Sequence, residues 1–146
     1  DGVTTVDADI PLGACLPDIV VSTRDARRVV PESARVDQLV ETVGWAATLT
    51  TGMHRDDPHL VGEGMNDTVV TPARAELIDG YSQVRDAALS AGATGVTISG
   101  AGPTVIAACE DGDRRAVGTA MIDQFNAVGV EARVYQTEIG DGATLF

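Results

Sequence analysis

The spacing of apolar residues along the chain predicts five helices. They cover residues 23–30, 37–52, 60–67, 80–92 and 114–128. The second has the clearest pattern, because apolar or small residues recur at i, i+3, i+4 and i+7, as on one face of a helix. These residues are Leu39, Val40, Val43, Ala46, Ala47 and Thr50. The pattern predicts that this face is buried, with Asp37 capping the start of the helix and Gly52 ending it.

The first and last helices carry similar signals. Ser22 or Thr23 can cap the first helix, and Pro31 ends it. In the last helix the residues predicted to face inward are Val117, Ala120, Met121, Phe125 and Val128. Residues 69–78 are predicted to be a connector, because Pro72 interrupts them.

Short runs rich in β-branched residues predict four strands. They lie at residues 19–23, 96–99, 105–109 and 130–137. Strands in one layer and helices in another give an α+β fold, a two-layer sandwich. The helix–strand–strand–helix–strand order from residue 80 onward resembles part of a ferredoxin-like unit.

The first sixteen residues look different from the rest. They contain the breakers Pro11 and Gly13 and do not begin with Met. We therefore expect residues 1–16 to be the end of an earlier element, and the chain to be a fragment of a longer protein. Residues 17–146 are expected to form one domain, since 146 residues suit a single domain of ordinary size.

Composition limits where the protein works. No apolar run approaches the ~20 residues of a membrane span, and no basic segment followed by an apolar one opens the chain as in a signal peptide. We therefore expect a soluble, cytoplasmic protein without a membrane partner. Cys15 and Cys109 lie in apolar surroundings and are expected to be reduced and buried. His54 and His59 are expected to be solvated loop residues, and no metal site is predicted.

The charge is strongly acidic. The net charge is −12, all ten basic residues are Arg, and Asp outnumbers Glu. This balance is typical of salt-adapted proteins, although an acidic protein from an ordinary cell would show it too. Nucleic-acid binding is disfavoured, because phosphate neutralisation needs a basic patch. The absence of Lys excludes a phosphate-loop Lys and a Schiff-base Lys.

One glycine-rich segment carries most of the functional information. It reads Gly92-Ala-Thr-Gly-Val-Thr-Ile-Ser-Gly-Ala-Gly-Pro-Thr-Val-Ile-Ala107. Taken alone, Gly100 and Gly102 could form the turn of a plain β-hairpin. Two other segments stand out: Pro17-Asp-Ile-Val-Val-Ser-Thr-Arg-Asp-Ala-Arg27, and Asn66-Asp67 followed by Pro72-Ala-Arg74 and Leu77-Ile78.

Together and in this order, the three segments resemble motifs of the GHMP small-molecule kinases in their homoserine kinase form. The resemblance runs from about residue 17 to 136. It implies the C-terminal domain of such a kinase, with residues 1–16 ending the N-terminal kinase domain. The implied reaction is ATP-dependent phosphorylation of L-homoserine in threonine biosynthesis, and the family makes a homodimer possible.

The resemblance also implies roles for particular residues. Arg27 and Arg74 would hold the substrate carboxylate, for which a guanidinium is suited because two parallel N–H donors match two oxygens. Thr23 would lie near the substrate hydroxyl as a catalytic residue, unless it only caps its helix. Ser99, Gly100, Ala101 and Gly102 would support the phosphate end of the ATP site. Either Arg could instead be an exposed partner of an acidic residue.

One family motif is absent. The phosphate loop of the family, P-x-G-L-G-S-S, does not occur in these 146 residues. The resemblance therefore places ATP and Mg²⁺ mainly on another part of the protein, and this chain alone is expected to be inactive. Two alternatives stay open at this point: the C-terminal domain of another GHMP kinase, or a free-standing ferredoxin-like module that binds a ligand.

Overall fold

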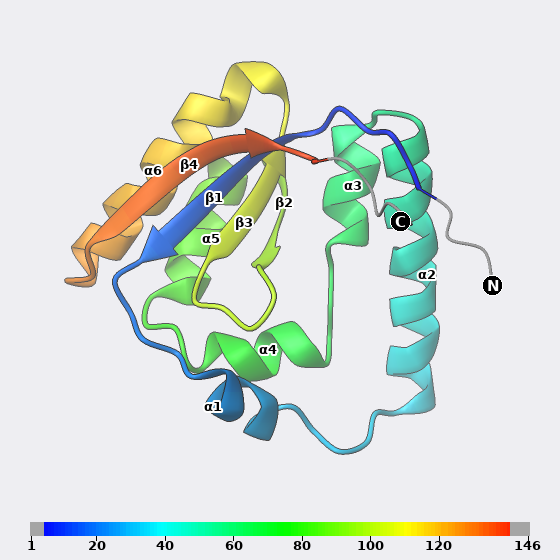
Figure 1. The fold of residues 1–146 in the computed structure, drawn as a ribbon, viewed down its shortest axis with the longest axis horizontal. Coiled ribbons are helices and arrows are strands. Elements are labelled where there is room, and N and C mark those ends of the chain that lie inside the picture. Colours follow the sequence, from blue (N-terminus) through cyan, green and yellow to red (C-terminus); the bar gives the residue numbers. More distant parts are fainter. Residues whose placement is uncertain (1–4, 141–146) are drawn as a thin grey trace, which may run out of the picture.

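A four-stranded antiparallel sheet lies at the centre of the protein (Figure 1), as seen in a computed structural model that describes residues 5–140. Its strands are β1 (Pro11–Pro17), β2 (Ala93–Ile98), β3 (Val105–Cys109) and β4 (Ala132–Glu138). The strand order is β2-β3-β1-β4, and every neighbouring pair is antiparallel. Cys15 pairs with Val105 on one side and with Val134 on the other, so β1 is an inner strand.

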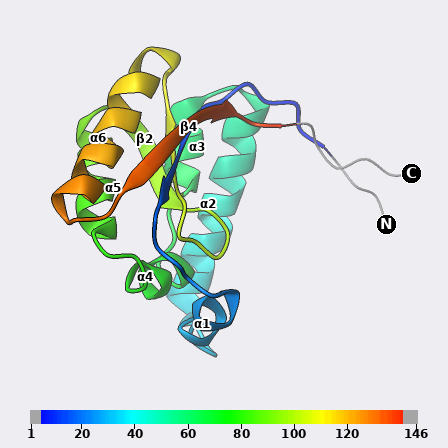
Figure 2. The same ribbon diagram turned by 60° about the vertical axis from the view of Figure 1, so that its left-hand side comes forward.

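Two helices cover one face of the sheet. They are α5 (Tyr81–Ser90) and α6 (Arg114–Ala127), which lie together on one side of the sheet in Figures 1 and 2. The order β1-α5-β2-β3-α6-β4, with this strand order, is that of a ferredoxin-like sandwich, so the predicted fold class is confirmed. The fully buried side chains of this layer include Val84, Val117, Met121 and Phe125.

Four helices are inserted between β1 and α5. They are α1 (Thr23–Arg28), α2 (Val36–His54), α3 (Pro58–Gly64) and α4 (Val70–Ala75). Figure 2 shows α2 and α3 on the sheet side opposite α5 and α6, and α1 with α4 beyond one end of the sheet. A second small core lies under α3, where Val61, Ala108 and Ile10 are buried.

The backbones of α3 and β2 touch at a pair of glycines. A Cβ placed on Gly62 would lie 2.2 Å from the carbonyl carbon of Thr94, and one placed on Gly95 would lie 2.2 Å from the Gly62 oxygen. No real side chain fits at such distances, so glycine at both positions allows α3 to lie directly on the strand.

Several predictions about local structure were wrong. Residues 19–23 form no strand; the strand is β1, at Pro11–Pro17. Pro11 and Pro17 stand at the two ends of this strand, where a missing N–H costs least. Residues 11–16 therefore belong to this sheet, and we propose that the domain starts N-terminal to them rather than at residue 17.

Two expectations about α2 also fail. Asp37 does not cap it: the helix begins after Arg35, whose backbone N–H donates to Gln38 Oε1 at 3.0 Å, and Asp37 lies in the first turn. The apolar face predicted to be buried is exposed, with Leu39 at 60% and Val43 at 62% of full exposure. Helical spacing shows that residues share a face, but it cannot show which face meets the core.

Other outcomes are mixed. Residues 69–78 are largely helical, because Pro72 falls in the first turn of α4, where its missing N–H is tolerated. Val128 is 40% exposed instead of buried. His54 ends α2 and His59 lies in α3, both exposed. Cys15 and Cys109 are free and buried, as predicted.

Within residues 5–140, no helix combines the length and the apolar character needed to cross a membrane.

Candidate functional site

Arg74 links α1, α4 and the turn between β2 and β3. From α4, its Nε donates to the carbonyl oxygen of Ala26 in α1 at 3.2 Å. Its Nη1 donates to the carbonyl oxygen of Gly100 at 2.6 Å. One guanidinium therefore holds together two segments that lie 48 and 26 residues away in the sequence.

Helix α1 is fixed by its cap and by one buried residue. The Ser22 side chain accepts a hydrogen bond from the Asp25 N–H at 3.0 Å, so Ser22, not Thr23, is the N-cap. Ala26 is fully buried. Because Ala26 faces inward and its carbonyl is held by Arg74, the neighbouring Arg27 backbone is also held at this place.

Helix α4 is positioned by Asp67. Its carboxylate accepts from the backbone N–H groups of Val69 at 2.7 Å, Val70 at 3.0 Å and Thr71 at 2.7 Å. These groups would otherwise lack partners at the helix start. Desolvation acts to raise the pKa of Asp67, but the three N–H donors outweigh it and leave the pKa lowered. Asp67 therefore stays ionised and sets the direction in which α4 presents Arg74.

In the turn between β2 and β3, part of the backbone is accessible and not hydrogen-bonded. It is closed by Ser99 N–H to Thr104 O at 2.8 Å and by Gly102 N–H to Ser99 O at 3.0 Å. Gly100 and Gly102 have φ values of 56° and 85°, which other residues rarely adopt. No atom lies within 4 Å of a Cβ built on Gly100. The N–H groups of Gly100 and Ala101 have no acceptor among the described residues.

The structure brings some of the predicted site residues together. Arg74 contacts the turn formed by Ser99, Gly100, Ala101 and Gly102, and it also contacts the residue before Arg27. Arg27 is exposed and makes no ion pair with any residue in the range 5–140. Thr23 is the first residue of α1 and is exposed.

This arrangement suits an anionic ligand. It combines the Arg74 guanidinium with backbone N–H groups that have no acceptor among the described residues, beside an open turn. Both kinds of donor bind carboxylate or phosphate oxygens. In the part of the chain that the structure describes, no group of three His, Cys, Asp or Glu side chains could hold a metal ion.

Sequence reasoning leaves Asn66 and Asp67 open between a polar site residue and an ordinary helix-end residue. Asp67 has the helix-end role, because its carboxylate accepts from the N–H groups at the start of α4. The Ala26 carbonyl could not have been found, because nothing in a sequence marks a backbone oxygen that a distant side chain will bind. Asn66 has the helix-end role considered for it, since its Nδ2 donates to the Glu63 carbonyl at 2.8 Å.

Comparison with known proteins gives the class of the chain. Residues 49–127 match the family described as GHMP kinases C terminal, and the chain belongs to that family. Homoserine kinase from Haloarcula marismortui is 78% identical over 145 residues, which make up 99% of this chain and 50% of that protein. Homoserine kinase from Natronomonas pharaonis is 70% identical over 146 residues, again 50% of its length. The chain thus spans about half the length of these curated relatives.

Solved structures agree with the fold. The crystal structure of homoserine kinase from Cytophaga hutchinsonii superposes with a TM-score of 0.85 at 35% identity, covering 90% of this chain and 42% of that one. A crystal structure of L. major mevalonate kinase in complex with R-mevalonate reaches a TM-score of 0.71 at 13% identity, covering 95% of this chain and 45% of that one. The second likeness concerns the fold alone.

Proposed function

We propose that this chain is the homoserine-binding half of an ATP-dependent homoserine kinase, which transfers a phosphoryl group to the hydroxyl of L-homoserine. The observation that carries the proposal is the position of Arg74, fixed between the Ala26 and Gly100 carbonyls. A guanidinium held in this way, beside an open glycine turn and against the helix that carries Arg27, is suited to bind a small substrate that carries a carboxylate.

Arg74 keeps donors for a ligand. A guanidinium has five N–H groups, and the two contacts to backbone oxygens use one on Nε and one on Nη1. The remaining N–H groups lie on the Nη1 and Nη2 end, where they can meet both oxygens of a carboxylate. Arg27 supplies a second guanidinium from α1, and the Thr23 hydroxyl, one turn earlier, is proposed to lie near the hydroxyl that becomes phosphorylated.

The glycine turn is proposed to face the phosphates of ATP. Successive N–H groups in a turn form an anion-binding surface, and those of Gly100 and Ala101 are free among the described residues. When bound, ATP supplies the phosphoryl group, and phosphoryl transfer depends mainly on positioning and on neutralising charge. Mg²⁺ is proposed to bind to the half of the protein that this chain does not span.

The acidic composition supports a proposal about the cell in which the protein works. With a net charge of −12 and no Lys, the enzyme would work in the cytoplasm of a salt-adapted cell. At ~1 M salt, repulsion between its surface carboxylates is screened within roughly 3 Å. The homodimer implied by the resemblance stays a proposal as well.

A chimeric enzyme tests the substrate assignment. In this chimera, the half of Haloarcula marismortui homoserine kinase that aligns with this chain is replaced by the chain itself. We expect the chimera to turn over ATP with homoserine and not with mevalonate. Arg27→Ala and Arg74→Ala should each raise the KM for homoserine about 10- to 100-fold, as expected for the loss of a charge-assisted contact of ~1.5–3 kcal/mol.

The control is Arg115→Ala, which removes an exposed guanidinium from α6 without touching the site. It should leave the KM for homoserine unchanged. If both site variants behave like Arg115→Ala, these arginines do not bind the substrate. If mevalonate is the better substrate of the chimera, the chain belongs to another kinase of the family.

A further inference from the structure

Helix α2 has its apolar face on the side that points away from the protein. Four large apolar residues on this face are 60–77% exposed: Val36, Leu39, Val40 and Val43. Their i, i+3, i+4 and i+7 spacing makes one continuous stripe. Ala46 and Ala47 continue it, and both are exposed. We call these six residues the α2 stripe.

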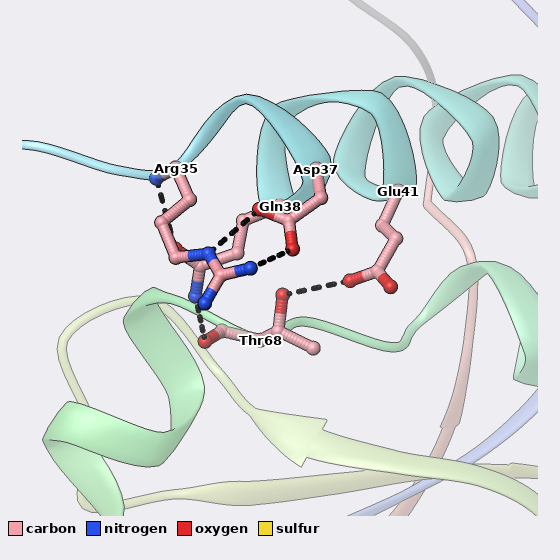
Figure 3. Close-up of polar contacts among 5 residues, drawn as sticks. All are labelled: Arg35, Asp37, Gln38, Glu41 and Thr68. Carbon is pink, nitrogen blue, oxygen red and sulfur yellow. Dashed lines mark hydrogen bonds and ion pairs between the residues drawn. The ribbon is translucent and has the colours of Figure 1, made fainter.

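The other side of α2 faces the rest of the chain. Gln38 Nε2 donates to the Thr68 carbonyl at 3.2 Å, and the Thr68 hydroxyl donates to Glu41 at 3.3 Å (Figure 3). Further along the helix, Gly52 is buried, and a Cβ placed there would lie 2.6 Å from the Val61 nitrogen in α3. The helix therefore turns Gln38, Glu41 and Gly52 toward the rest of the chain, and further along it Leu49 and Met53 pack against the second core. Its other apolar face is left exposed.

The scarcity of charge on α2 makes this exposure more unusual. The chain has 22 acidic and 10 basic residues among 146, yet no residue from Thr42 to Met53 is charged. The charges of α2 itself, Asp37 and Glu41, lie near its start. An exposed apolar face without charge, on a protein that is otherwise highly charged, is typical of a contact surface.

From this we infer that the α2 stripe is the surface on which the other half of the kinase polypeptide docks. The relatives at 70–78% identity are about twice as long as the part that this chain matches, so in them a further segment of similar length accompanies this fold. The inference goes beyond the proposed function, because it concerns what covers the helix and not what the site binds.

A second copy of the chain is the less suitable occupant of the α2 stripe. A stable interface between separate molecules buries about 800 Å² per partner from roughly 20–30 residues, which a stripe of six residues on one helix does not provide. A contact within one polypeptide can be smaller, because the effective concentration of the tethered half is high.

Cysteine labelling tests whether the stripe is covered. Val43→Cys places a thiol on the α2 stripe, and Thr119→Cys places one on the exposed side of α6 as a matched control. The native Cys15 and Cys109 are fully buried, and burial raises the pKa of Cys15 to about 12, so they give little background with a maleimide. Each variant is labelled in the 146-residue chain and in the chimera.

We expect Val43→Cys to react rapidly in the chain alone and at least about tenfold more slowly in the chimera, since a thiol in an interface reacts only when the contact opens. Thr119→Cys should react rapidly in both. Equal rapid labelling of Val43→Cys in both proteins would overturn the inference. So would slow labelling in the chain alone that becomes fast on dilution, because a second copy would then be the occupant.

Paired substitutions give an independent test. Val40→Asp with Val43→Asp adds two carboxylates to the stripe, and Ala116→Asp with Thr119→Asp adds two at the same i, i+3 spacing on the exposed side of α6. We expect the first pair to lower the unfolding midpoint of the chimera but not that of the chain alone, and the second pair to change neither. No effect of the first pair on the chimera would contradict the inference.

Homoserine-dependent ATP turnover is measured on the same chimera. An active chimera in which Val43→Cys stays reactive would leave the proposed function standing and remove the docking surface. An inactive chimera in which Val43→Cys is protected would leave the docking surface standing and count against the proposed function.

Discussion

Arg74 Nη1 lies 2.6 Å from the carbonyl oxygen of Gly100, so a side chain of α4 fixes the turn that follows β2. The same guanidinium donates to Ala26 at 3.2 Å. The planar guanidinium of Arg74 thus joins α4, α1 and the turn after β2. Lys has a single ammonium and cannot reproduce two donors in a fixed plane.

The link predicts a stability effect in the 146-residue chain. Arg74→Lys should lower the free energy of unfolding by about 1–2 kcal/mol, somewhat less than a fully buried charged hydrogen bond, because Arg74 is partly exposed. Denaturant unfolding at constant salt measures it. Arg24→Lys is the control, since Arg24 is exposed in α1 and makes no ion pair with the described residues. Equal effects of the two substitutions would contradict the linking role.

The contact between Gly62 and Gly95 gives a second prediction. Gly62→Ala would place a Cβ 2.2 Å from the backbone of Thr94, so α3 must move away from β2. We expect a loss of about 3 kcal/mol or more in the free energy of unfolding, at the upper end of overpacking effects. Gly44→Ala in α2 is the matched control, because nothing lies within 4 Å of its Cβ, and it should stabilise by about 0.5–1 kcal/mol. Similar results for both glycines would show that α3 does not rest on β2 as described.

The elements that local pattern determines were predictable from the sequence. The last helix, with Val117, Met121 and Phe125 inward, and the pair of strands around Gly100 follow from spacing and turn residues alone. Strand β1 was missed because it holds small residues and is bounded by prolines, so its strand character comes from pairing with β3 and β4 and not from propensity.

The arrangement of the candidate site was predictable only in part. The motifs indicated Arg74 and the glycine turn, and the structure places these two in contact. The sequence does not show which face of a helix packs against the rest of the protein. The stripe on α2 was correctly recognised as one face, but its exposure depends on Gln38 and Gly52 packing against distant segments.

Asp67 predicts how stability depends on pH. The pKa of its carboxyl is lowered in the folded protein, where backbone N–H donors outweigh desolvation. Ionised Asp67 therefore stabilises the fold above its ordinary pKa of 3.8, and this contribution is lost as the pH falls through the lower, folded value. Asp67→Asn keeps one acceptor oxygen but loses the second oxygen and the negative charge beside the start of α4, so it should reduce the free energy of unfolding at pH 6–7 by about 0.3–1 kcal/mol.

The difference between wild type and Asp67→Asn should shrink as the pH falls below 4, because protonation then removes the same charge from the wild type. Urea unfolding across this pH range measures it. Asp123→Asn on the exposed side of α6 is the control. A constant difference between wild type and Asp67→Asn would show that the carboxylate charge does not hold α4.

For Tyr81 we predict the opposite effect: removing its hydroxyl oxygen should not destabilise the fold. Its side chain is 6% exposed, and its hydroxyl has no hydrogen-bond partner among the described residues. A buried hydroxyl without a partner costs about 1–3 kcal/mol. Tyr81→Phe keeps the ring and should leave the free energy of unfolding unchanged or raise it by about 1 kcal/mol.

The alkaline range separates this effect from simple repacking. Burial raises the pKa of Tyr81 above its ordinary value of 10.0, so the unfolded chain ionises first and wild-type stability should fall as the pH rises above 10. Tyr81→Phe should lose less stability there than the wild type, whereas Tyr135→Phe, at a residue 54% exposed, should follow the wild type. A Tyr81→Phe variant that is less stable at neutral pH would mean that the hydroxyl has a partner, and α5 would then be held at its first residue by a polar contact.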